Sequence, residues 1–176
     1  MLSFVERRVV LAPAQIRCGE AHHIIMTNFV LIPGAWMGAW VWEEVAEGLR
    51  ALGHHVSPVT LSGLSKGTEH QGRWPAPDLA ALEGNDLSAE QMQWLLSRFV
   101  GHPGRTVCEP TVLSRPLSAQ RATYIACTMG GHWLSEDVKA MRKEPNWTFR
   151  TIQTGHFPMV STPNRLVELL DEVAAR

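Results

Sequence analysis

The chain is poor in several residue types, and each shortage excludes a class of protein. Only three of its 176 residues are cysteine, namely Cys18, Cys108 and Cys127, which lie far apart and without C-x-x-C spacing. We therefore expect neither a disulfide framework nor a zinc site, and reduced thiols in a cytoplasmic setting fit better. No apolar stretch approaches the length of a membrane span, so we expect no membrane partner.

The chain also lacks an excess of either positive or negative charge. The chain has 16 basic and 17 acidic residues, a formal net charge of −1, and no block of like charges. This balance gives no electrostatic case for nucleic acid or an anionic membrane as a partner. Apolar residues make up 45% of the chain, enough for one domain with a core. We expect that domain over residues 26–176. In residues 1–25 arginines interrupt a short apolar run, and we expect a poorly ordered extension rather than a signal peptide.

The most informative stretch that is present covers residues 29–42, FVLIPGAWMGAWVW. A continuous apolar run is typical of a strand buried on both faces of a parallel sheet, and Pro33-Gly34 ends it abruptly. In α/β proteins a glycine-cornered loop at this place presents backbone N–H groups to a ligand.

The rest of the chain continues a strand and helix alternation with one interruption. Residues 62–87 are rich in Gly, Pro and polar residues, and we predict no strand there; residues 102–117 read as a loop with prolines. Ser88 is a candidate N-cap for the helix that follows it. The expected strands cover residues 28–32, 55–61, 122–127 and 147–152, and the expected helices cover residues 40–52, 88–99, 136–142 and 162–175. The prediction is an α/β fold with a mostly parallel sheet flanked by helices.

Three segments together resemble the α/β-hydrolase superfamily, in particular small esterases related to plant methyl-ester esterases, to hydroxynitrile lyases and to bacterial counterparts. They are residues 29–63, residues 74–113 with WLLSRFVGHPGRTVCEPTVL, and residues 121–170 with TGHFPMVSTPNRLVELL. The resemblance implies a shortened α/β-hydrolase fold with a cap-derived segment over residues 74–117. It also implies hydrolysis of a small carboxylic ester, with no metal or organic cofactor.

The resemblance assigns roles to particular residues. In such enzymes a histidine takes the proton of an attacking serine, and two backbone N–H groups stabilise the oxyanion. By this resemblance His156 is the general base. The N–H of Ala35 is an oxyanion donor, Gly34 allows close approach, and Trp36 contributes to substrate binding. Trp36, Trp40 and Trp42 are candidates for lining an apolar pocket beside the loop.

The nucleophile of the family is missing. Its G-x-S-x-G elbow should lie between residues 61 and 74, yet the chain passes from the second strand almost directly into the cap-like segment. Ser65 lies in a literal match, GLSKG, but the residues after it are a poor helix broken by glycine and proline. We therefore keep Ser65 only as a weak candidate nucleophile.

The carboxylate of the triad is not assigned either. Relatives often carry an aspartate soon after the strand that matches residues 122–127, where this chain reads Thr128-Met129-Gly130-Gly131-His132. Glu136 and Asp137 follow, but we expect both to begin a solvated helix. The adjacent pairs His22-His23 and His54-His55 point to opposite faces in extended backbone, which argues against a shared metal.

Three functions remain open from the sequence. The first is an esterase-like hydrolase by descent, catalytically impaired by the absent elbow. The second is a non-catalytic remnant that binds a small apolar ligand, and the third is an active hydrolase using Ser65 and His156. Loss of a central strand should either close up its neighbours or leave an apolar sheet edge open to self-association.

Overall fold

The structure is a computed structural model that describes residues 26–65, 72–129 and 135–175. The predicted extension over residues 1–25, which includes the pair His22-His23, lies outside the described residues. The described elements, in chain order, are β1 (Asn28–Leu31), η1 (Ala39–Trp42), α1 (Glu43–Ala51), β2 (His55–Pro58), β3 (Arg73–Trp74), η2 (Ala80–Leu82), α2 (Ala89–Leu96), β4 (His102–Pro103), α3 (Arg105–Cys108), η3 (Leu117–Ala119), β5 (Ala122–Cys127), α4 (Glu136–Met141), β6 (Trp147–Ile152), α5 (Pro158–Ser161) and α6 (Pro163–Ala174).

The N-terminal unit is the predicted strand, helix and strand. β1 pairs in parallel with β2, and Phe29 lies opposite Val56. The predicted helix begins as the 3-10 turn η1 and continues as α1, whose buried face consists of Val45, Ala46 and Leu49. β2 ends at Pro58, earlier than predicted, in keeping with a proline that has no N–H for the ladder.

The C-terminal unit repeats this arrangement. β5 and β6 cover the predicted ranges and pair in parallel, with Ala122 opposite Trp147. α4 connects them, and α6 begins at Pro163, where the missing proline N–H costs nothing. The buried face of α6 includes Leu166, Leu169 and Leu170, and Val173 further along is half-buried.

The two parallel pairs do not join into one sheet. Within the described residues the strands form three separate two-stranded sheets, β1 with β2, β3 with β4, and β5 with β6. The expected α/β class is confirmed, but the expectation of one mostly parallel sheet needs this correction. Val30 is 41% exposed on β1, and every residue of β5 is only half-buried, as expected where neighbouring strands are absent. The self-association that such an edge allows stays a prediction.

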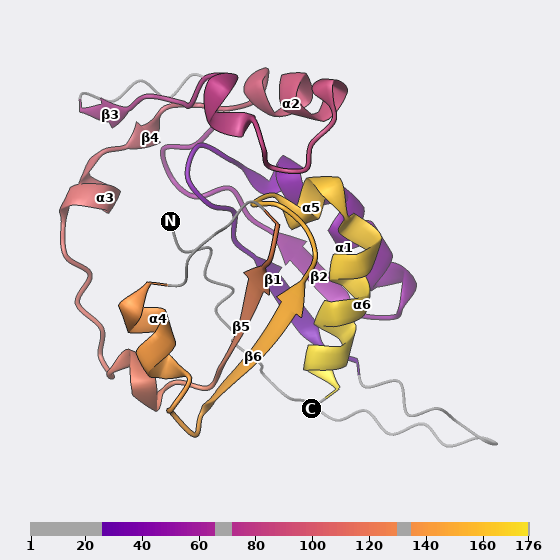
Figure 1. Cartoon of the computed structure of the whole chain (residues 1–176), viewed down its shortest axis with the longest axis vertical. Helices are drawn as coiled ribbons and strands as arrows, with labels where there is room; N and C mark the ends of the chain where they lie inside the picture. The colour runs from indigo at the N-terminus through magenta and orange to yellow at the C-terminus, as the bar shows by residue number, and fades with distance from the viewer. Residues whose placement is uncertain (1–25, 66–71, 130–134, 176) are drawn as a thin grey trace.

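Helix packing joins the two units. α1 and α6 lie side by side on one face of the strands (Figure 1) and form one hydrophobic cluster that includes Leu31 of β1 and Ile152 of β6. The helices approach closely at Gly48, where a Cβ atom would lie 2.8 Å from Cγ2 of Val167. A larger residue at position 48 would push α6 away.

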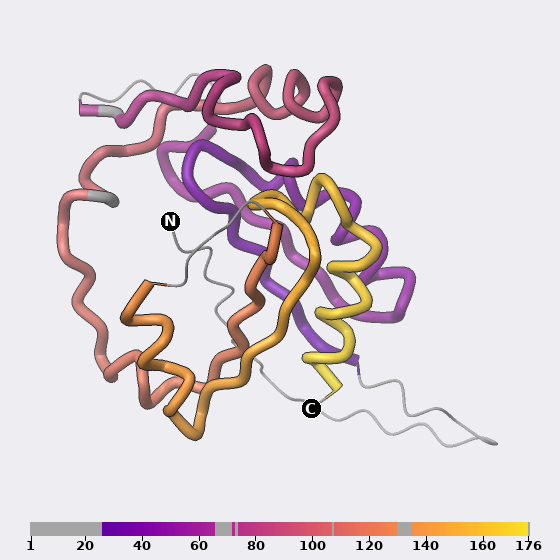
Figure 2. The backbone as a smooth tube through the Cα atoms, in the orientation of Figure 1, coloured from indigo at the N-terminus to yellow at the C-terminus, as the bar shows by residue number. Residues whose placement is uncertain are grey.

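The segment between the two units crosses the top of the molecule and then descends along one side (Figure 2). It contains α2, whose N-cap Ser88 forms a capping box with Gln91 as the sequence suggests. The short pair β3 and β4 and the short helix α3 were not predicted; two-residue strands and single turns carry no hydrophobic periodicity. No described helix is both long enough and apolar enough to cross a membrane.

A buried histidine ties the start of β1 to α6. His54 is 5% exposed, its Nδ1 accepts the backbone N–H of Thr27 at 3.2 Å, and its Nε2 lies 2.9 Å from Oδ1 of Asp171. Because Nδ1 is an acceptor, the ring proton is on Nε2, which donates to the carboxylate. The sequence pair His54-His55 thus divides into one structural histidine and one exposed histidine.

Replacing His54 with alanine should destabilise the fold by about 2 kcal/mol, since the buried N–H of Thr27 loses its acceptor. Urea denaturation of the two single variants measures the effect. The matched control is His55→Ala at the exposed neighbour, for which we expect a change within about 0.5 kcal/mol. Equal losses in both variants would contradict the assigned role of His54.

Candidate active site at the carboxyl ends of the strands

The candidate site lies where the strands end beneath the α2 segment. The arrowheads of β2, β5 and β6 point toward this end of the molecule in Figure 1. In open α/β proteins ligands bind at the carboxyl ends of the strands. The loop after β1 and the loop after β6 both open here, and α5, which follows the second loop, packs against η1 and α1, which follow the first.

The loop after β1 contains a buried backbone donor. Ala35 is 6% exposed and lies in a turn directly after Gly34. Its N–H has no hydrogen-bond partner among the described residues. A buried N–H without a partner is uncommon, and a donor held at a strand end can bind a ligand oxygen.

Trp36 has strained backbone and is held by the cap-like segment. Its φ is +65°, which is unusual for a bulky side chain. Its N–H donates to Nδ1 of His102 at 3.3 Å, its carbonyl accepts from Val100 at 3.1 Å, and its ring lies 4.2 Å from that of Trp74. Strain of this kind persists where the surroundings over-determine it, often in ligand-binding loops.

The three tryptophans proposed for one apolar pocket take different positions. Trp36 is half-buried against Trp74, Trp40 packs edge-on to Trp94 at 5.1 Å, and Trp42 is 3% exposed in the hydrophobic core. The expectation that all three line one pocket beside the loop therefore fails at Trp42. Trp42 belongs instead to the core shared by α1 and α6.

His156 lies in the loop between β6 and α5. It is half-buried, and its ring meets Phe157 edge-on at 5.1 Å. Phe157 is buried and precedes Pro158, the first residue of α5. A histidine between the last strand and the following helix occupies the position that the family resemblance implies for the base.

The cap-like segment fixes the backbone of this histidine loop. A Cβ atom at Gly155 would clash with the backbone carbonyl of Asn85, so only glycine fits there. Thr154 is fully buried, and its Oγ1 lies 2.6 Å from Oγ of Ser161 and donates over 3.5 Å to Oδ2 of Asp86. Contacts with a distant segment therefore position His156.

Asp86 is a carboxylate that sequence reasoning missed. It adopts a left-handed conformation, with φ of +57°, beside Thr154. The contact of 3.5 Å is long for a hydroxyl donor. Nothing in the sequence links residue 86 to residue 154; a left-handed aspartate after Gly84-Asn85 is only a turn signal.

Ser65 lacks the setting of a nucleophile. It is exposed and follows a turn in which the N–H of Leu64 bonds to the carbonyl of Leu61 at 3.1 Å. β2 ends at Pro58, so no strand leads directly into the serine. Residues 66–71 lie outside the described residues. A nucleophile elbow requires a strand that runs straight into a strained turn.

Two other residues near the strand ends are also poorly suited to act as the triad acid or as a nucleophile. Glu136 begins α4 as predicted and forms an ion pair with Lys139 at 2.7 Å. Cys127 ends β5, but burial raises the pKa of its thiol above the ordinary value, which keeps it protonated and weakly nucleophilic. Within the described ranges no group of three or more His, Cys, Asp or Glu residues is placed to hold a metal ion.

The fold resembles solved structures of tomato methylketone synthase I. A variant complexed with beta-ketoheptanoate gives a TM-score of 0.64 at 14% identity, over 86% of this chain and 98% of that chain. The complex with 2-tridecanone gives 0.62 at 13% identity, over the same shares of both chains. These neighbours have the α/β-hydrolase fold, so the expected fold is confirmed.

Sequence comparison gives a short match. The chain is 44% identical over 41 residues to a carbendazim hydrolyzing esterase of Nocardioides sp. (strain SG-4G). That match covers 23% of this chain and only 17% of the esterase. No family model matches the chain. The comparisons thus show an α/β-hydrolase fold and a short sequence likeness to one esterase.

Substituting Gly155 by alanine should separate the histidine loop from Asn85 and destabilise the fold by roughly 1–3 kcal/mol through overpacking. Thermal or urea unfolding measures this loss. Gln153→Ala at an exposed position of the same loop is the control, with an expected change within about 0.5 kcal/mol. Wild-type stability of Gly155→Ala would show that the contact does not constrain the loop.

Proposed function

We propose that this chain is an α/β-hydrolase-fold protein that binds a small carbonyl compound beside Ala35 and His156 and turns over esters poorly. The ligand carbonyl oxygen accepts the N–H of Ala35, and His156 is the candidate for proton transfer. Trp36 contributes an apolar surface beside the donor. No metal or organic cofactor is needed for these contacts.

The proposal rests on the position of Ser65 in the structure. An exposed serine in a turn after β2 has no strand to hold it at the strand ends. Removing a triad serine lowers the rate on the order of a million-fold, even when the oxyanion donors stay in place. Binding of a carbonyl compound, by contrast, needs only the donor and an apolar contact.

The comparisons support the choice of ligand class. The ligands named for the tomato structures are beta-ketoheptanoate and 2-tridecanone, both ketones with an alkyl chain. The short match to an esterase supports an ester as the ancestral substrate. A ketone and an ester present the same kind of carbonyl oxygen to a backbone N–H.

A serine-directed fluorophosphonate should not label the protein above background, and short-chain p-nitrophenyl esters should be hydrolysed no faster than in protein-free buffer. Gel fluorescence and absorbance follow the two reactions. Strong labelling that disappears in Ser65→Ala but persists in Ser62→Ala, an exposed serine in the same loop, would overturn the proposal. That result would favour an active hydrolase using Ser65 and His156.

Decarboxylation of a β-keto acid is a second candidate, favoured by the same missing elbow. The bond between the α-carbon and the carboxylate breaks, carbon dioxide leaves, and the electron pair moves into an enolate whose negative charge on the ketone oxygen is stabilised by the N–H donor. A proton then returns to the α-carbon and gives a methyl ketone. The reaction needs an oxyanion donor and a proton carrier but no nucleophile, which fits Ala35 and His156.

With beta-ketoheptanoate as substrate, the folded protein should form 2-hexanone faster than the spontaneous reaction, and His156→Ala should lower the excess rate at least about tenfold. Gas chromatography of the headspace measures the product. His55→Ala, at an exposed histidine remote from the candidate loops, should keep the wild-type rate. An identical rate with and without protein excludes this second function and leaves the binding proposal to be judged by ligand titration.

A further inference from the structure

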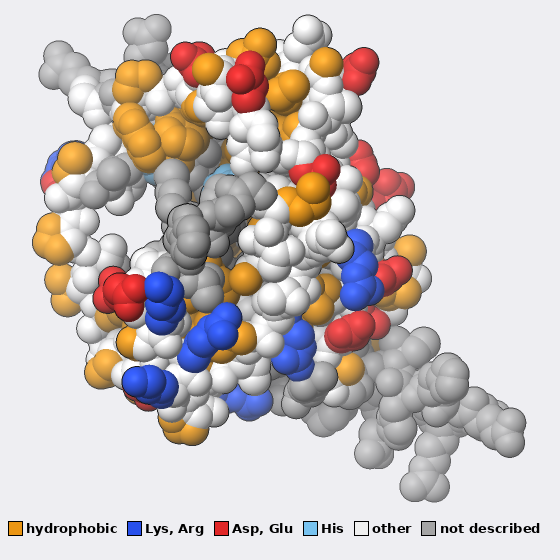
Figure 3. Space-filling view, in the orientation of Figure 1, with side chains coloured by type: hydrophobic (Ala, Val, Ile, Leu, Met, Phe, Trp, Pro, Cys, Tyr) orange, Lys and Arg blue, Asp and Glu red, His pale blue; other side chains and the backbone are white. Residues whose placement is uncertain are grey.

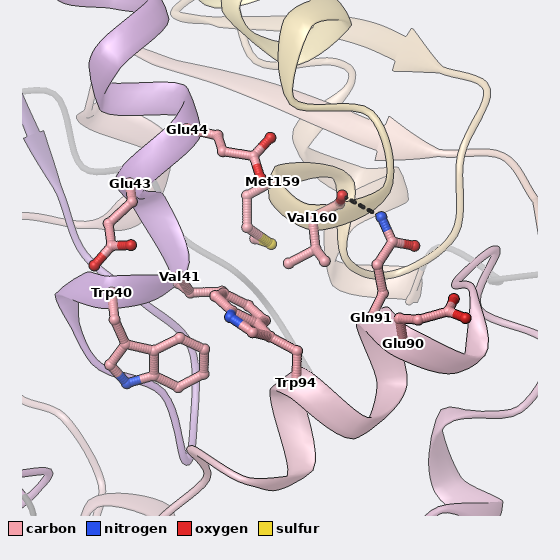
Figure 4. Close-up of a pocket in the computed structure, with 9 residues that line it drawn as sticks. All are labelled: Trp40, Val41, Glu43, Glu44, Glu90, Gln91, Trp94, Met159 and Val160. Carbon is pink, nitrogen blue, oxygen red and sulfur yellow. Dashed lines mark hydrogen bonds between the residues drawn. The ribbon is translucent and has the colours of Figure 1, made fainter.

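A pocket of about 300 Å³ lies outside the candidate site. It is formed where η1 and the start of α1 meet α2 and α5, three segments that are far apart in the sequence (Figure 4). Neither Ala35, Trp36 nor His156 lines it. Its volume is at the lower end of the range for small-molecule sites.

The lining is aromatic on its apolar side. The rings of Trp40 and Trp94 meet edge-on at 5.1 Å, and the thioether of the buried residue Met159 lies beyond them. The face of Trp94 already accepts a cation, because the guanidinium of Arg98 lies 4.6 Å from the ring centroid. Such rings attract cationic groups through their negative faces.

The charges that line the pocket are all negative. Its ionisable residues are Glu43 and Glu44 from α1 and Glu90 from α2, and no Lys, Arg or His lines it. A hydrogen bond from its own backbone N–H, and a second from the hydroxyl of Ser88 at 2.8 Å, lower the pKa of the Glu90 carboxyl. Glu43 and Glu44 form no ion pair with any described residue. Figure 3 shows acidic side chains over the α2 and α1 side, whereas basic side chains gather over β6 and α4.

Contacts between residues of different elements hold the walls of the pocket together. The side chain of Gln91 in α2 donates to the carbonyl of Val160 in α5 at 2.8 Å and bridges its two walls (Figure 4). Trp40 packs further on Phe99, with ring centroids 6.4 Å apart. The two walls of the pocket and the ring of Trp40 are therefore held in place by contacts within the protein.

From this arrangement we propose that the pocket binds a small organic cation of the alkylammonium class. The indole rings of Trp40 and Trp94 contact the alkyl groups, and Glu43 and Glu44 neutralise the charge. An anionic ligand would meet three carboxylates, and a neutral ligand would leave their repulsion uncompensated. The proposal is independent of the carbonyl site, because no residue is shared between the two.

Isothermal titration with choline tests this, using the uncharged isostere 3,3-dimethyl-1-butanol as the matched ligand. We expect saturable binding of choline in the millimolar range and at least about tenfold weaker binding of the isostere, the cation–π and ionic contributions together exceeding about 1.4 kcal/mol. Equal affinities for the two compounds, or no saturable binding of choline, would overturn the proposal.

Variants of the pocket residues test whether choline binds in this pocket. Glu43→Gln combined with Glu44→Gln should weaken choline at least about tenfold, and so should Trp94→Leu, with circular dichroism checking that each variant is folded. Glu47→Gln is the control, because it removes the same charge from an exposed position of α1 outside the pocket. If Glu47→Gln weakens choline as much as the pocket variants, the attraction is that of the general acidic surface and the assignment of the pocket is wrong.

Discussion

The close approach of α1 and α6 is the constraint on which the rest of the structure depends. The parallel pairs β1–β2 and β5–β6 share no strand pairing, so main-chain hydrogen bonds cannot join the N-terminal and C-terminal units. The two helices do so instead, through side chains such as Leu49 and Leu170 that are almost fully buried. Each such burial contributes about 1.5–3 kcal/mol. Gly48 permits the contact, because any larger residue would meet Val167.

This constraint explains which parts of the structure could be predicted from the sequence. The long elements follow local periodicity, and so β5, β6, α6 and α2 with its Ser88 cap lie within a few residues of their predicted positions. The separation of the sheet into two pairs could not be predicted, because periodicity reports which face of an element is buried and not which strand lies beside it. That information depends on contacts between residues far apart in the chain.

In the candidate site, too, some features could be predicted from the sequence and others could not. The loop after β1 and His156 were predicted from motif resemblance, and each follows the strand that the prediction assigned to it. The contacts that fix these loops were not predicted, since they come from residues 72–103. His102, Val100 and Trp74 hold the left-handed Trp36, while Asn85 and Asp86 lie against Gly155 and Thr154. The cap-like segment thus shapes both loops at once.

Because residues 72–103 contact both the loop after β1 and the loop after β6, these loops can be compared with those of an intact α/β-hydrolase. In an α/β-hydrolase the nucleophile strand normally stands between the strand of the oxyanion loop and the strand before the base, and its elbow supplies both the serine and a second oxyanion donor. Here the described residues contain no strand between β2 and β5 other than β3 and β4, and contacts with α5, η1 and residues 72–103 support the two loops instead. Preorganised donors stabilise negative charge at an oxygen whether or not a serine creates it. This is the physical reason for proposing a carbonyl ligand or a decarboxylation at this site rather than acyl transfer.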